Sequence, residues 1–215
     1  MTSVPSAHGG HRHDAGAVQS PVLAGHEARA WADLVLRGYA RATNLSFAGT
    51  RFLLVGTGSV ADALAGALAR FGGGVVLAAH DPIELLAISR RYGIPARLIR
   101  ATPFVTPDVD VLVTTGRGHP PLTAEAIAAG ERSLVVLNAA PPAEASAGTL
   151  DAGGPLSTVR SLTQFGGPRP IFTAPRVDPG QLDQAIATAR STHARLVTAF
   201  GADEADAELA KALLA

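Results

Sequence analysis

A short glycine-rich segment, GTGSVA at residues 56–61, has the residue types and spacing that ligand-binding chemistry needs. Its pattern is G-x-G-x-x-A, between an apolar run at 52–55 and a helix predicted over 61–71. The first glycine allows a tight turn, the second lets the backbone approach a pyrophosphate, and the small third residue lets the helix pack on the strand. The phosphates would lie at the positive end of that helix. The pattern therefore predicts a dinucleotide site, for NAD or NADP, made by Gly56, Thr57, Gly58, Ser59, Val60 and Ala61.

The residue that should hold the adenosine ribose is different from the usual one. An acid normally follows the glycines by about 20 residues, at the tip of the second strand. Here that strand, predicted over 75–79, ends in Ala79 and is followed by His80 and Asp81. Asp81 either contacts a ribose hydroxyl or caps the helix predicted to begin at Pro82, and the capping interpretation is favoured. Without the acid, His80 or Arg90 could bind a 2′-phosphate, so we expect weak NAD binding with little preference over NADP.

Two further groups of side chains could do chemistry. His119 follows a strand end in GRGHPP, where it is a candidate general acid or base, although a loop histidine held by neighbouring prolines is the favoured interpretation. Arg117 has a similar position and could meet an anionic group. His8, His11 and His13 cluster near the start of the chain, but no acid or thiol completes a defined geometry. We therefore predict no metal site.

These residues must be positioned by alternating strands and helices. A helix is predicted over 27–43, and the alternation that follows is typical of a doubly wound parallel sheet, an α/β Rossmann-like fold with an N-terminal helix and C-terminal helices. The predicted strand order is 3-2-1-4-5, with a sixth strand near Ile171. Residues 1–24 are predicted to be a disordered tail, residues 25–215 one dinucleotide-binding domain, and residues 140–157 a mobile loop. Further strands are expected at 96–99, 109–114 and 133–138, and further helices at 82–91, 123–129, 181–200 and 204–214.

The composition excludes several classes of protein. Lys plus Arg equals Asp plus Glu, 18 against 18, so no net field would attract nucleic acid or an anionic membrane. The chain has no cysteine, which excludes disulfides and thiolate chemistry. No apolar run approaches the ~20 residues of a membrane span, and the start of the chain lacks the apolar core of a signal peptide. We expect a cytoplasmic protein with no nucleic-acid or membrane partner.

Two segments form a specific combination, and two later segments add to it. Residues 41–49, RATNLSFAG, precede the first predicted strand, and Asp-Pro-Ile at 81–83 opens the helix after the second. Residues 109–118, VDVLVTTGRG, and residues 133–141, SLVVLNAAP, cover two later strand ends. Over roughly residues 36–140, this combination resembles the cofactor domain of the S-adenosylhomocysteine hydrolase (adenosylhomocysteinase) family.

The resemblance implies an NAD-binding domain with Thr115 and Gly116 at the cofactor and Asn138 near the nicotinamide amide. Ala79 stands where the family has its ribose-binding glutamate, and Pro141 stands where it has a histidine. The family's substrate domain, with its K-x-x-x-D-N segment, has no recognisable counterpart here. We therefore expect that this chain alone does not carry out the complete hydrolase reaction.

Two functions remain open at this point. One is a small NAD(P)-dependent oxidoreductase-type enzyme, or a component of one, that works on a nucleoside or similar polar metabolite. The other is a nucleotide-binding module without chemistry of its own, or a degenerate homologue. An enzyme would need a substrate pocket from the C-terminal segment, a second copy or a partner protein, so we expect a homodimer or a partner subunit.

Overall fold

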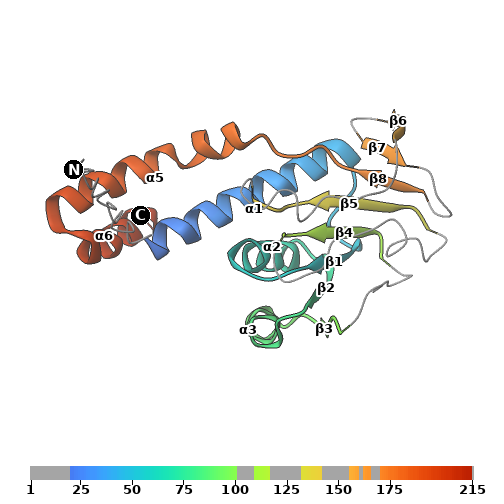
Figure 1. The fold of residues 1–215 in the computed structure, drawn as a ribbon, viewed down its shortest axis with the longest axis horizontal. Coiled ribbons are helices and arrows are strands. Elements are labelled where there is room, and N and C mark those ends of the chain that lie inside the picture. The colour runs from blue at the N-terminus through green and yellow to red at the C-terminus, as the bar shows by residue number, and fades with distance from the viewer. Residues whose placement is uncertain are drawn as a thin grey trace, which may run out of the picture.

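The protein is built on one mixed β-sheet (Figure 1). The structure, a computed structural model, describes residues 20–100, 109–116, 132–141, 155–159, 162–165 and 170–214. In these residues the strand order is β3-β2-β1-β4-β5-β8-β7-β6, and the strands from β3 to β8 in that order run parallel. The predicted order 3-2-1-4-5 and the sixth strand at Ile171 are confirmed. The strands are β1 (Arg51–Val55), β2 (Gly74–Ala79), β3 (Ala96–Leu98), β4 (Val111–Thr114), β5 (Leu134–Asn138), β6 (Pro155–Val159), β7 (Leu162–Phe165) and β8 (Ile171–Thr173).

The strand β6 begins inside the mobile loop that is predicted through residue 157, and β7 follows it, so that prediction is wrong for residues 155–157. They pair antiparallel with each other, and β7 pairs antiparallel with β8. The prediction fails because Pro155 and the glycines before it read as loop residues. However, β6 is the outermost strand and Pro155 is its first residue, a position where the missing backbone N–H is tolerated.

The helix before β1 is longer than predicted. Ser20 caps it, because the Ser20 hydroxyl oxygen accepts a 2.9 Å hydrogen bond from the Leu23 backbone N–H. The helix begins at Pro21 rather than at residue 27, so residues 21–24 belong to it and not to a tail. Residues 1–19 and the helix predicted over 123–129 lie outside the described residues. The described helices are α1 (Pro21–Thr43), α2 (Ser59–Arg70), α3 (Pro82–Tyr92), α5 (Pro179–Phe200) and α6 (Ala202–Leu214).

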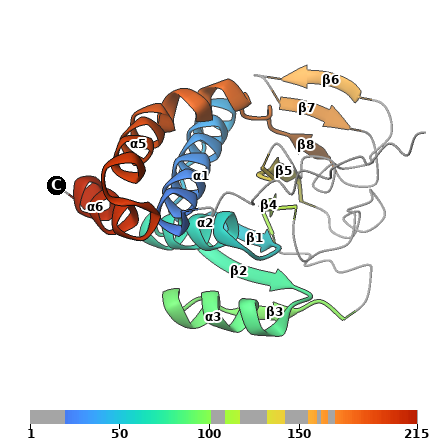
Figure 2. The ribbon, with the colours of Figure 1, turned by 60° about the vertical axis from the view of Figure 1, so that its left-hand side comes forward.

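The parallel strands are apolar on both faces, as the continuous apolar runs predict. In β1, the side chains of Phe52 and Leu54 pack with α1, α2 and α3, whereas Leu53 and Val55 belong to a second cluster on the opposite face. The helices α1, α2, α3 and α5 gather on one side of the strands (Figure 2). The sheet is therefore held by packing on both faces, and the carboxyl ends of its strands position the candidate site.

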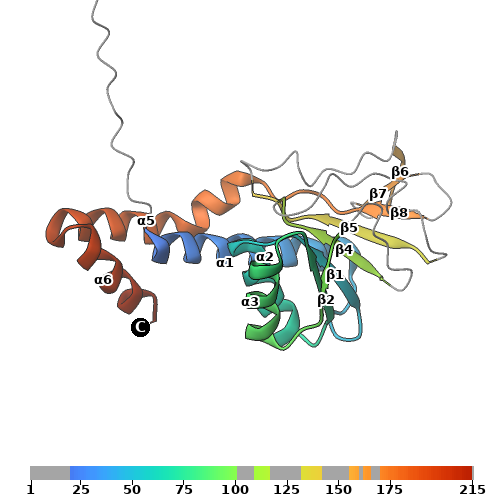
Figure 3. The ribbon, with the colours of Figure 1, turned by 60° about the horizontal axis from the view of Figure 1, so that its bottom comes forward.

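The start of α1, the end of α5 and α6 extend beyond the sheet as a group of packed helices (Figure 3). Arg190 of α5 forms a 2.9 Å ion pair with Glu27 of α1. Asp206 of α6 accepts a hydrogen bond from the Ser20 hydroxyl and lies 3.3 Å from His193 Nε2 of α5. These contacts tie the ends of the three helices together. Among the described residues, none of the helices has the length and apolar character needed to cross a bilayer.

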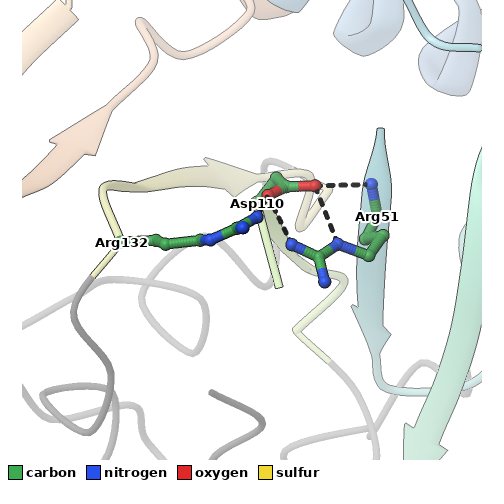
Figure 4. A network of polar contacts seen from close by, with 3 residues as sticks. All are labelled: Arg51, Asp110 and Arg132. Carbon is green, nitrogen blue, oxygen red and sulfur yellow. Dashed lines mark hydrogen bonds and ion pairs between the residues drawn. The ribbon is translucent and has the colours of Figure 1, made fainter. Parts of the chain in front are cut away.

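A polar network ties the amino ends of β1, β4 and β5 (Figure 4). The Asp110 carboxylate accepts hydrogen bonds from the Arg51 backbone N–H at 3.0 Å and from Arg51 Nε and Nη2, each at 3.2 Å. Arg132 lies 4.0 Å from the same carboxylate. The hydrogen bonds from Arg51 lower the pKa of Asp110 below its usual value. This network lies at the amino ends of the strands, opposite to the glycine-rich turn, and it joins the starts of neighbouring strands.

Candidate functional site

The glycine-rich turn joins β1 to α2 and has the backbone shape that its sequence pattern predicts. The φ angles are 115° at Gly56 and 90° at Gly58, a region that favours glycine over any residue with a Cβ. The Gly56 N–H donates a 2.8 Å hydrogen bond to the Ala78 carbonyl, which holds the turn against β2. Thr57 is buried within the turn, and Ala61 is fully buried where α2 meets the sheet. The turn therefore brings bare backbone to the carboxyl edge of the sheet.

The first turn of α2 provides donors for an anion. Gly58 is the N-cap and has no side chain to bond the helix terminus, and the first intrahelical bond runs from the Asp62 N–H to the Gly58 carbonyl at 3.0 Å. The N–H groups of residues 59–61 precede that bond, at the positive end of the helix. Asp62 is acidic but forms an ion pair with Arg91 of α3. Positive-φ glycines followed by an uncapped helix terminus are the donor set that a pyrophosphate requires, so the residues present fit a dinucleotide.

The tip of β2 carries no acid. Ala79 is fully buried, and its carbonyl accepts a 2.8 Å hydrogen bond from the Ile99 N–H. Asp81 Oδ1 accepts from the backbone N–H groups of Ile83 at 2.8 Å and Glu84 at 3.2 Å, so the capping interpretation of Asp81 is confirmed.

Arg90 does not belong to this site. It lies in the last turn of α3, eight residues after the helix begins at Pro82. At a rise of 1.5 Å per residue, that separation is about 12 Å along the helix axis. The interpretation of Arg90 as a 2′-phosphate ligand is therefore wrong, because the helix carries it away from the strand tip.

His80 lies directly after Ala79 and is exposed. Its ring nitrogen Nδ1 lies 2.8 Å from the carbonyl oxygen of Ile99, the residue that follows β3. The ring therefore bridges the tips of β2 and β3. A carbonyl oxygen accepts and cannot donate, so this contact assigns the hydrogen to Nδ1.

The carboxyl ends of β4 and β5 complete the edge. The Thr115 N–H and hydroxyl both donate to the Val55 carbonyl, at 3.1 and 3.2 Å, so Thr115 fixes the end of β4 to the end of β1. Gly116 follows with a φ of 83°. Asn138 Oδ1 accepts from the Ala140 N–H at 3.0 Å. The structure thus brings Thr115, Gly116 and Asn138 to the same edge as the glycine-rich turn, while Arg117 and His119 lie outside the described residues.

One contact beside the site joins two residues whose pairing the sequence does not predict. The Trp31 indole of α1 donates a 2.8 Å hydrogen bond to the carbonyl of Ala139, the residue after Asn138. The periodicity of residues 27–43 predicts that Trp31 is buried, which is confirmed, but a backbone carbonyl carries no sequence signal.

Comparison with known proteins shows which solved structures share this fold. No protein-family model matches the chain, and no curated protein matches it. Dipicolinate synthase from Bacillus subtilis is similar in structure, with a TM-score of 0.50 and 15% identity over 82% of this chain and 56% of that chain. The corresponding dipicolinate synthase chain from Bacillus halodurans has a TM-score of 0.42 and 21% identity, over 53% of this chain and 39% of that one. L-tryptophan dehydrogenase from Nostoc punctiforme has a TM-score of 0.37 and 16% identity, over 42% and 28%.

The fold is Rossmann-like. At these identities the likeness bears on the fold alone. The chain spans less than two thirds of each of these solved structures, at most 56%.

Proposed function

We propose that this chain is an NAD(P)-binding Rossmann-fold protein of the dehydrogenase type. The observation that supports the proposal most is the turn with positive φ at Gly56 and Gly58, which leads into the uncapped first turn of α2. In this proposal, the backbone of Gly56, Thr57, Gly58, Ser59, Val60 and Ala61 holds the phosphates. When bound, the cofactor supplies hydride transfer, and the protein supplies binding and orientation.

The remaining contacts follow the carboxyl edge of the sheet. His80 and Asp81 flank the ribose end, and Thr115, Gly116 and Asn138 lie toward the nicotinamide end. The resemblance to adenosylhomocysteinases supports this assignment for Asn138. Because Thr115 uses its hydroxyl and N–H on the Val55 carbonyl, it is a positioning residue that sets the shape of the edge.

We also propose that a second copy or a partner protein completes the substrate pocket. The substrate class that the resemblance supports is a nucleoside or similar polar metabolite, with His119 as a candidate general acid or base. Sedimentation velocity over a range of concentrations, with and without cofactor, tests the homodimer. A strictly monomeric species under all conditions would contradict self-association.

A nucleotide-binding module without chemistry is the second candidate. It is favoured by the buried Ala79 at the tip of β2 and by Pro141 in the place of a family histidine. Turnover of nucleoside substrates by the NAD-loaded protein, alone or with a partner, would decide for the enzyme.

Binding itself is tested by calorimetric titration and thermal shift with NAD, NADP and adenosine. Gly58→Val should abolish the dinucleotide-induced shift, because a side chain there strains the turn and occupies the approach to the pyrophosphate. Gly25→Val is the matched control, since a Cβ at Gly25 of α1 meets no atom within 4 Å. Equal shifts in the wild type and Gly58→Val would overturn the proposed site.

A further inference from the structure

His80 has a defined donor and acceptor arrangement at the tip of β2. Its Nδ1 donates to the Ile99 carbonyl at 2.8 Å, which fixes both the ring orientation and the tautomer of the neutral side chain. In a neutral imidazole one nitrogen donates and the other accepts, so Nε2 has an unprotonated lone pair. Neutral His80 is therefore a hydrogen-bond acceptor on the exposed side of the strand tip.

Of the two residues beside His80, one has no polar side chain and the other is engaged as a helix cap. Ala79 is fully buried and has no polar side chain, and Asp81 directs Oδ1 to the N–H groups of Ile83 and Glu84. The charged residues closest along the chain are Asp81 and Glu84, at the start of α3. The ring contacts Ile99, which the exposed Arg100 directly follows.

We propose that His80 replaces the missing acid as the acceptor for the 2′-hydroxyl of the adenosine ribose, and so sets the choice between NAD and NADP. This inference rests on the dinucleotide site proposed above. Neutral Nε2 accepts from the hydroxyl, as a carboxylate does in NAD-selective sites. A hydroxyl donor suits this lone pair, whereas a 2′-phosphate dianion offers only acceptors and is disfavoured.

The first test uses the wild-type protein alone. Isothermal titration at about pH 8 compares NAD with its analogue that lacks the 2′-hydroxyl on the adenosine ribose, and NAD should bind about three- to tenfold more tightly. In His80→Ala, the two ligands should bind equally. Equal binding of the two ligands by the wild type overturns the proposal. This comparison needs only the wild-type protein, so it holds even where His80→Ala does not fold.

The second test compares NAD with NADP at about pH 8. The ratio of NAD affinity to NADP affinity should be about three- to tenfold higher in the wild type than in His80→Ala. An equal ratio in the two proteins overturns the role of His80. Absence of any dinucleotide binding, with Gly58→Val indistinguishable from the wild type, would instead overturn the proposed function.

Discussion

The indole N–H of Trp31 donates a 2.8 Å hydrogen bond to the carbonyl oxygen of Ala139, across 108 positions of the chain. Both residues are buried, at 4% and 0% exposure, so neither polar group has access to water when the bond is lost. The bond attaches α1 to the end of β5, next to Asn138. The position of a helix that precedes the sheet is thus coupled to the carboxyl end of β5, at the candidate site.

Trp31→Phe keeps an aromatic ring but leaves the Ala139 carbonyl unpaired. We expect the free energy of unfolding to fall by about 1–3 kcal/mol, measured by urea denaturation. Tyr39→Phe is the matched control on the same helix, because the Tyr39 hydroxyl is buried with no hydrogen-bond partner among the described residues. That substitution should leave stability unchanged or raise it. A larger loss in Tyr39→Phe than in Trp31→Phe would contradict this account.

Asp110→Asn removes the charge from the network at the amino edge of the sheet. We expect a loss of about 1 kcal/mol at neutral pH, modest because the side chains of Arg51 and Asp110 are 40% and 33% exposed and the pair is screened. Because the pKa of Asp110 is lowered in the folded state, its contribution is present above the unfolded pKa and is lost as the pH falls through the folded one.

The difference between the wild type and Asp110→Asn should therefore shrink below about pH 4. Asp33→Asn is the control, since Asp33 pairs with Arg37 on the exposed face of α1. It should change stability little at any pH. A difference for Asp110→Asn that stays constant down to about pH 2 would argue against an ionic contribution.

Ala79→Glu tests whether the ribose lies at the tip of β2. A glutamate at this fully buried position should lower the thermal stability of the free protein, since a buried carboxylate without partners is costly. If the ribose lies there, the same substitution should tighten NAD by one to two decades, corresponding to about 1.5–3 kcal/mol, and should discriminate against NADP. Calorimetric titrations of the wild type and Ala79→Glu with NAD and NADP measure these affinities. Tight, NAD-selective binding that persists in His80→Ala would instead support a ribose contact by Asp81.

Asp206 connects the helices that extend beyond the sheet. Asp206→Ala removes the acceptor for the Ser20 hydroxyl and the partner of His193, so hydrogen exchange should accelerate in α6 and in the first turn of α1. An effect of about 1–2 kcal/mol corresponds to roughly five- to thirtyfold faster exchange. Glu208→Ala removes only an exposed pair with Lys211 and should leave exchange unchanged. Equal effects of the two substitutions would show that Asp206 has no special role.

Most of the fold was predictable because parallel strands buried on both faces read as apolar runs between glycine-bounded turns. The cap at Asp81 was also predictable, since an aspartate before a proline is a local signal for a helix start. The antiparallel pair β6 and β7 was not, because an edge strand that begins at Pro155 resembles a loop. Arg90 was misassigned because it is close to the strand tip in sequence, whereas α3 places it about 12 Å away along the helix axis. The His80–Ile99 and Trp31–Ala139 contacts depend on backbone carbonyls, which no residue type encodes.

The sheet's two outermost described strands have one further consequence. At one border, β6 opens with a proline that cannot donate, and at the other, β3 is only three residues long and carries an exposed arginine, Arg97. Short, charged or proline-bearing borders resist the addition of a strand from another molecule. Continuous sheets running from one copy of the chain into the next are thereby disfavoured at both borders. Assembly with a second copy would then use surfaces other than these two border strands.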